Sequence, residues 1–105
     1  MKNYLTAGAL ALLTVAVATS ASAHTLRIGC HSEGADKIVC EGAYSDGKLA
    51  AAGDIKVVTE KGVVLVSGKT DAKGVYSFAK PKGEYAVVLQ TGPQHMTNLS
   101  SADIK

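Results

Sequence analysis

Apolar and polar residues alternate along much of the chain, and this period of two is typical of half-buried β-strands. In the first such segment one face carries Leu26, Ile28 and Cys30. A second segment, over 37–44, places on one face Ile38, Cys40 and Tyr44. The polar loop 32–36 joins the two segments, and this arrangement predicts a β-hairpin. Folding the hairpin symmetrically about Ala35 places Cys30 opposite Cys40.

Five more strand-like segments follow, over 54–60, 63–69, 75–78, 84–89 and 96–99. They are separated by turn residues at 61–62, 70–74, 81–83 and 92–94. In the second of these turns Asp71 can bond its own backbone and Gly74 can take a positive φ. Only 49–52 leans toward a helix, and it is too short to form one alone. About seven strands with closely spaced turns predict an all-β, antiparallel β-sandwich.

The first 23 residues have a different pattern, typical of a secretory signal peptide. Lys2 precedes an apolar run over 5–18, and Ala21-Ser22-Ala23 provides a small-x-small cleavage site. The run is shorter than the roughly 20 residues that a membrane span needs, although an uncleaved N-terminal anchor is the alternative. We therefore expect cleavage after Ala23, export to a bacterial periplasm, and a single domain over 24–105.

The charge balance of that domain bears on its partners, and its length bears on how its fold is stabilised. Loss of Lys2 with the signal peptide leaves ten basic side chains against nine acidic ones in the remaining 82 residues. This balance lacks the basic stripe of nucleic-acid-binding proteins, so no nucleic-acid partner is expected. A core this small often needs a covalent cross-link, and Cys30 and Cys40 would form a disulfide in an oxidising compartment. Thiolate metal ligation is the alternative, but nine intervening residues do not match the spacing of such sites.

His24 is the most informative candidate for chemistry. Cleavage after Ala23 would make it the first residue, with a free α-amine and an imidazole. These groups ordinarily titrate near pH 7.7 and 6.5, and together they can chelate a transition metal. Metal affinity should therefore fall below about pH 6.5. A frayed terminus without function is the alternative.

The other ligand candidates lie further along the chain. His95 follows the longest apolar strand, where a rigid scaffold can hold a loop residue. His31 is expected at the surface near the hairpin loop, facing away from the side of His24. Met96 is a soft ligand for Cu(I), although core packing is the favoured interpretation. The sequence has none of the nucleophile-elbow, phosphate-loop, zinc-protease or EF-hand motifs, so it predicts no hydrolytic or phosphoryl-transfer enzyme.

One segment resembles a known family. Residues 67–78, with the sequence Ser-Gly-Lys-Thr-Asp-Ala-Lys-Gly-Val-Tyr-Ser-Phe, resemble a strand–turn–strand of transthyretin-like, carboxypeptidase-regulatory-type sandwiches. Residues 41–47, residues 95–104 and a mature start at His24 add to this likeness. Taken together, these features make the chain similar to the small soluble accessory component of nickel or cobalt uptake transporters of the energy-coupling-factor type. The fold implied is a transthyretin-like or immunoglobulin-like sandwich.

The resemblance implies a periplasmic domain that captures Ni²⁺ or Co²⁺ and serves a membrane permease subunit. His24 matches the starting histidine of that family, and His95 matches the histidine of its glycine-containing loop. Two features depart from the family pattern. Gln94 and Met96 flank His95 where the family often has Gly and a basic residue, which leaves the metal open. The sequence ends at Lys105 without the C-terminal membrane helix of many relatives, so we expect a partner protein to provide any membrane attachment.

Three other functions stay open. A copper-binding protein is the nearest, because Cu²⁺ binds such ligands more tightly than Ni²⁺ does. A copper-dependent oxidase built on an N-terminal histidine is less favoured, because the domain has little surface for a polymer. A structural or interaction sandwich without metal is the third, since a fold alone does not give a function.

Overall fold

The computed structural model describes residues 25–105, so the predicted signal peptide and His24 lie outside the described residues. Seven strands and a short 3-10 helix make up this part of the chain. In order they are β1 (Leu26–Glu33), β2 (Lys37–Tyr44), β3 (Asp54–Thr59), β4 (Val64–Lys69), β5 (Val75–Ala79), β6 (Tyr85–Gly92), β7 (His95–Ser100) and the 3-10 helix (Ser101–Asp103).

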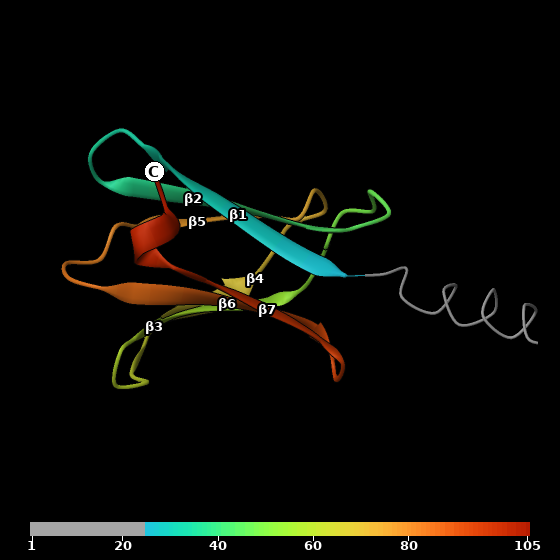
Figure 1. The fold of residues 1–105 in the computed structure, drawn as a ribbon. Coiled ribbons are helices and arrows are strands. Elements are labelled where there is room, and N and C mark those ends of the chain that lie inside the picture. Colours follow the sequence, from blue (N-terminus) through green and yellow to red (C-terminus); the bar gives the residue numbers. More distant parts are fainter. Residues whose placement is uncertain (1–24) are drawn as a thin grey trace, which may run out of the picture.

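The strands form two antiparallel sheets packed face to face (Figure 1). One sheet has the order β1-β2-β5 and the other the order β4-β3-β6-β7. Strands β1 and β7 contact each other where the sheets meet along one side. The prediction of an all-β antiparallel sandwich is confirmed.

The hairpin of β1 and β2 has the register expected from its symmetry about Ala35. Cys30 lies directly opposite Cys40, with their Cα atoms 4.0 Å apart, and the two side chains form a disulfide. Cys40 is buried and Cys30 packs against the core beside it. The predicted disulfide is therefore confirmed, and it joins neighbouring strands of the three-stranded sheet.

Alternation along the central strands produces the core between the sheets. Buried side chains come from every second residue of β2, β3 and β6: Ile38, Cys40, Ile55, Val57, Tyr85, Val87 and Leu89. Their neighbours in sequence face the outer surfaces, as a period of two requires. Leu26, Ala50 and Phe78 complete the buried set.

The connections at one end of the sandwich are fixed by buried polar contacts. The Thr70 side chain is buried, donates a hydrogen bond to the Ala50 carbonyl at 2.5 Å and accepts one from the Gly53 N–H at 2.8 Å. Gly74 has a φ of +78°, and its carbonyl accepts a hydrogen bond from the Gly42 N–H of β2 at 2.8 Å. These contacts tie the β2–β3 and β4–β5 connections together.

Asp71 stabilises the same β4–β5 turn. Its carboxylate accepts hydrogen bonds from the backbone N–H groups of Val75 at 2.9 Å and Lys73 at 2.8 Å. Both bonds favour the charged form and lower the pKa of Asp71 below its ordinary value. The predicted role of this aspartate as a turn former is confirmed.

One expectation about the last part of the chain is wrong. Strand β6 continues to Gly92, and β7 begins at His95, so His95 is a strand residue rather than a loop residue. The 3-10 helix after β7 was not expected from the sequence. It begins where the Ser100 hydroxyl accepts a hydrogen bond from the Ala102 N–H at 3.2 Å.

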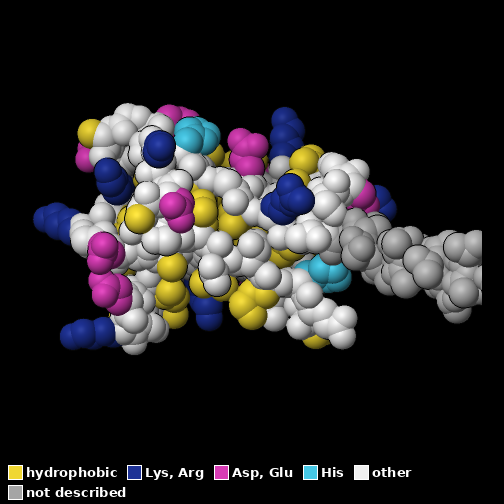
Figure 2. Space-filling view, viewed as in Figure 1, with side chains coloured by type: hydrophobic (Ala, Val, Ile, Leu, Met, Phe, Trp, Pro, Cys, Tyr) yellow, Lys and Arg dark blue, Asp and Glu magenta, His cyan; other side chains and the backbone are white. Residues whose placement is uncertain are grey.

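The connections between the strands lie at two opposite ends of the sandwich (Figure 1). Figure 2 shows basic and acidic side chains at both ends, and the β1–β2, β3–β4 and β5–β6 connections lie at one of them. The start of β1 and the β6–β7 turn lie at the opposite end (Figure 1).

Within residues 25–105 the structure has no helix of the length and apolarity required to cross a bilayer.

Candidate functional site

His95 lies at the tight turn between β6 and β7. It pairs with Gly92 across Pro93 and Gln94, and a register shift in β6 accompanies this pairing. The His95 side chain is half-buried, and its ring meets the edge of the Tyr44 ring, with the centroids 5.7 Å apart and the planes at 87°. The imidazole is therefore held against the end of β2, in the other sheet.

Tyr44 is itself well fixed. Its hydroxyl donates a hydrogen bond to the Thr91 Oγ1 atom of β6 at 2.6 Å, which links the two sheets next to His95. Its backbone N–H donates to the Lys48 carbonyl at 2.8 Å, and Tyr44 is the register partner of Leu26 in β1. Tyr44 thus connects the start of β1 with the start of β7.

The first described residue is anchored at the same place. The Thr25 N–H donates a hydrogen bond to the Ser45 Oγ atom at 2.9 Å, and the Ser45 N–H donates to the Thr25 carbonyl at 2.8 Å. Ser45 directly follows Tyr44, the residue that packs on His95. The residue that follows His24 in the sequence is therefore bonded next to the side chains around His95.

A shallow recess of about 200 Å³ opens beside His95. It is lined by Tyr44, Asp46, Lys48 and His95. Asp46 lies in the turn after β2, and its Oδ1 atom accepts a hydrogen bond from the Lys48 N–H at 3.0 Å. The recess offers an imidazole and a carboxylate, both of which are ligands of divalent transition metals.

A scan against protein-family models matched no family, and searches of curated proteins and of solved structures found no match to the chain. Among residues 25–105 no three side chains of His, Cys, Asp or Glu are grouped closely enough to hold a metal ion.

His31 and the cysteines lie elsewhere. His31 is exposed on β1, opposite Val39, on the outer face of the three-stranded sheet. It is six residues along the chain from Thr25, which is roughly 20 Å in a strand. Cys30 and Cys40 are bonded to each other, so their sulfur atoms are not thiolate ligands. The structure does not bring these three residues to His95.

Met96 faces away from His95, because successive side chains of a strand point to opposite faces. It is 58% exposed, so the expectation that it packs in the core is wrong. The reason is that Met96 lies on the outer face of β7, whereas His95, Thr97 and Leu99 are on the partly buried inner face.

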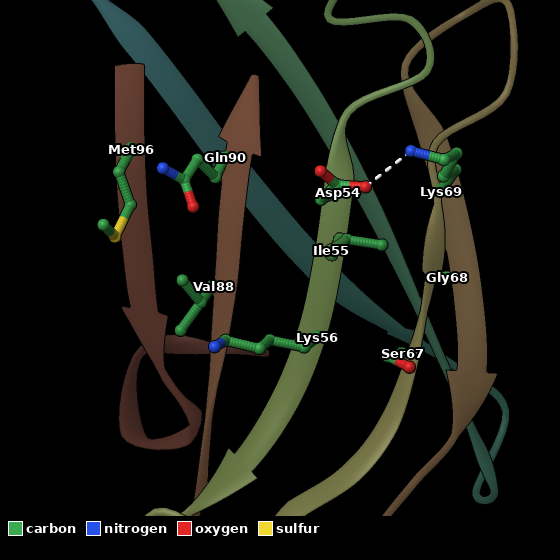
Figure 3. Close-up of a pocket in the computed structure, with 9 residues that line it drawn as sticks. All are labelled: Asp54, Ile55, Lys56, Ser67, Gly68, Lys69, Val88, Gln90 and Met96. Carbon is green, nitrogen blue, oxygen red and sulfur yellow. Dashed lines mark hydrogen bonds and ion pairs between the residues drawn. The ribbon is translucent and has the colours of Figure 1, made fainter. Parts of the chain in front are cut away.

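Met96 instead lines a depression on the outer face of the four-stranded sheet (Figure 3). Figure 3 shows it beside Gln90, with Lys56 extending from β3 toward Val88. On the far side of the depression Lys69 and Asp54 form an ion pair of 2.6 Å. The thioether is thus separated from the His95 imidazole by the sheet, and the two cannot bind one metal ion.

Asp46 was not among the candidate site residues identified from the sequence. No local pattern distinguishes it from other turn aspartates. Its position next to His95 arises from the packing of β2 against β6 and β7, which are about 50 residues away along the chain.

Proposed function

We propose that the domain from His24 to Lys105 is exported, binds Ni²⁺ or Co²⁺ through His24 and His95, and delivers the metal to a membrane permease. The metal is cargo in this proposal, and the chain is a binding protein rather than an enzyme. Cleavage after Ala23 would expose the His24 amine and ring as two nitrogen donors. The His95 ring would supply a third.

The observation that carries the proposal is the anchoring of Thr25 beside the residues that hold His95. His24 is covalently joined to Thr25, and consecutive Cα atoms are only about 3.8 Å apart. Thr25 is hydrogen-bonded to Ser45, and the preceding residue, Tyr44, packs on the His95 ring. The residue next to His24 in the sequence is thus held at the same end of the sandwich as His95.

Two further features support the proposal. The Cys30–Cys40 disulfide fits an oxidising compartment such as the periplasm. The half-buried, aromatic-backed position of His95 limits the side-chain freedom that a ligand would lose on binding metal. The transporter partner is proposed from the sequence resemblance alone.

The first test is calorimetric titration of Ni²⁺, Co²⁺ and Cu²⁺ into the processed protein, produced from the full chain with its own leader. The intact mass identifies the N-terminal residue. We expect one-to-one binding of Ni²⁺ that is lost in His95→Ala and retained in the matched control His31→Ala, because His31 lies on another face. Equal binding by wild type and His95→Ala would reject the site.

The titration also separates the copper alternative. Cu²⁺ is expected to bind the same nitrogen donors more tightly than Ni²⁺, following the usual order of divalent metals. Because Met96 faces away from His95, a Met96→Ala variant should leave the affinity for every metal unchanged. A loss of Cu(I) affinity in Met96→Ala would instead favour copper handling.

A further inference from the structure

We propose that the Asp46 carboxylate is an oxygen ligand of the metal held by His95, and that it favours Ni²⁺ and Co²⁺ over Cu(I). This inference rests on the proposed function. Asp46 lies in the recess beside His95, and the turn that carries it is bonded to Thr25, just before β1.

The backbone fixes the position of the carboxylate. The turn after β2 is closed by two hydrogen bonds, from the Gly47 N–H to the Tyr44 carbonyl at 2.9 Å and from the Tyr44 N–H to the Lys48 carbonyl at 2.8 Å. Ser45, which precedes Asp46, makes two hydrogen bonds with Thr25. Asp46 therefore belongs to a turn that is bonded to the first described residue, and it lines the recess together with His95.

The carboxylate can serve the turn and a metal at the same time. Its Oδ1 atom accepts a hydrogen bond from the Lys48 N–H at 3.0 Å. An ionised carboxylate has about four lone-pair positions, so it can accept hydrogen bonds and still ligate a metal. The recess is also lined by Lys48, whose positive charge opposes a divalent cation. The negative charge of Asp46 offsets that repulsion.

The donor set gives a preference among metals. Nitrogen donors together with a carboxylate oxygen suit borderline divalent ions, whereas Cu(I) prefers soft sulfur ligands. Met96, the sulfur donor nearest in sequence, lines the depression on the outer face of the sheet instead. Asp46 therefore supplies the third kind of donor group at the site, after the amine and the imidazoles.

The test compares Asp46→Asn with Asp54→Asn. An asparagine oxygen can still accept the hydrogen bond from the Lys48 N–H, so Asp46→Asn should keep the turn. Asp54 is exposed and paired with Lys69 on the outer face of the four-stranded sheet, so Asp54→Asn makes the same charge change away from the site. Urea denaturation of both variants checks that the fold is retained.

We expect Asp46→Asn to weaken Ni²⁺ binding at least as much as loss of an outer-shell partner does, roughly tenfold to a hundredfold. Asp54→Asn should bind as wild type does, and Cu(I) affinity should change in neither variant. Unchanged Ni²⁺ affinity in Asp46→Asn, or equal losses in both variants, would overturn the assignment of Asp46 while leaving the His24–His95 site in place. Absence of Ni²⁺ binding by wild type would instead reject the proposed function and this inference with it.

Discussion

Gly74 is the position where a single added methyl group should damage the fold most. It has a φ of +78°, and a Cβ atom there would meet the Gly42 carbonyl oxygen well inside contact distance and the Ala50 nitrogen at 3.1 Å. Both obstacles are backbone atoms, and they are hydrogen-bonded to each other at 2.9 Å. Gly34 is the matched control, because its φ is +72° and nothing lies within 4 Å of the position that an added methyl group would take.

The expected difference between Gly74→Ala and Gly34→Ala follows from these contacts. The left-handed conformation costs an alanine about 1–2 kcal/mol, and this part is common to both variants. Overpacking against fixed atoms adds about 1–3 kcal/mol at Gly74 only. Weakening of the hydrogen bond between the Gly42 N–H and the Gly74 carbonyl adds about 1 kcal/mol. We therefore expect a loss of about 1–2 kcal/mol for Gly34→Ala and about 3–6 kcal/mol for Gly74→Ala.

Urea denaturation with the disulfide intact measures both losses as changes in the free energy of unfolding. Small domains have only about 5–15 kcal/mol in total, so the Gly74→Ala effect should be a large shift of the midpoint. Similar losses in the two variants would show that the close approach of Gly74 to the Gly42 carbonyl does not constrain the fold.

Three further predictions concern stability. Thr70→Val should lower the free energy of unfolding by about 2–4 kcal/mol, because it leaves two buried backbone groups without their hydrogen-bond partner. Thr70→Ser keeps the hydroxyl and should keep most of the stability. Equal losses on urea denaturation would contradict the role of the hydroxyl. Replacing both Cys30 and Cys40 by serine should cost about 2–3 kcal/mol, as expected for a loop of this length, and unchanged stability in the same assay would refute that value. The pKa of Glu60 is raised, first by a hydrogen bond with Glu84 and then by the negative charge of Glu84. The pair therefore stabilises the fold fully below about pH 4.5, and this contribution decreases as the pH rises through the raised pKa of Glu60. Thermal denaturation between pH 4 and 7 should show that loss in wild type but not in Glu60→Gln, and parallel profiles would argue against it.

Much of the fold could be predicted from the sequence because burial of one sheet face imposes a period of two on each strand. The register of the first hairpin was also accessible, since its symmetry about Ala35 alone brings Cys30 opposite Cys40. The same pattern could not assign Met96. Alternation says which residues share a face, but which face of β7 the other sheet covers depends on how the two sheets pack.

The candidate site was predictable only in part. His95 could be predicted as a candidate ligand from its residue type and its place near the end of an apolar strand, whereas Asp46 could not. The proximity of Asp46 to His95 depends on how the two sheets pack. The bonds between Thr25 and Ser45 depend on the same packing, and they are what connect the N-terminal histidine with His95 in the proposal.

The central claim is that the free amine of His24 and the ring of His95 hold one metal ion. The most direct test titrates Ni²⁺ into the processed protein and into a version with one glycine inserted between Ala23 and His24, with intact masses confirming both N-termini. The insertion moves the amine away by one residue but leaves residues 25–105 unchanged. We predict one-to-one Ni²⁺ binding by the protein that begins at His24 and a large loss of affinity after the insertion, with identical urea denaturation of the two proteins. Equal Ni²⁺ affinity in both, or binding by neither, would contradict the claim.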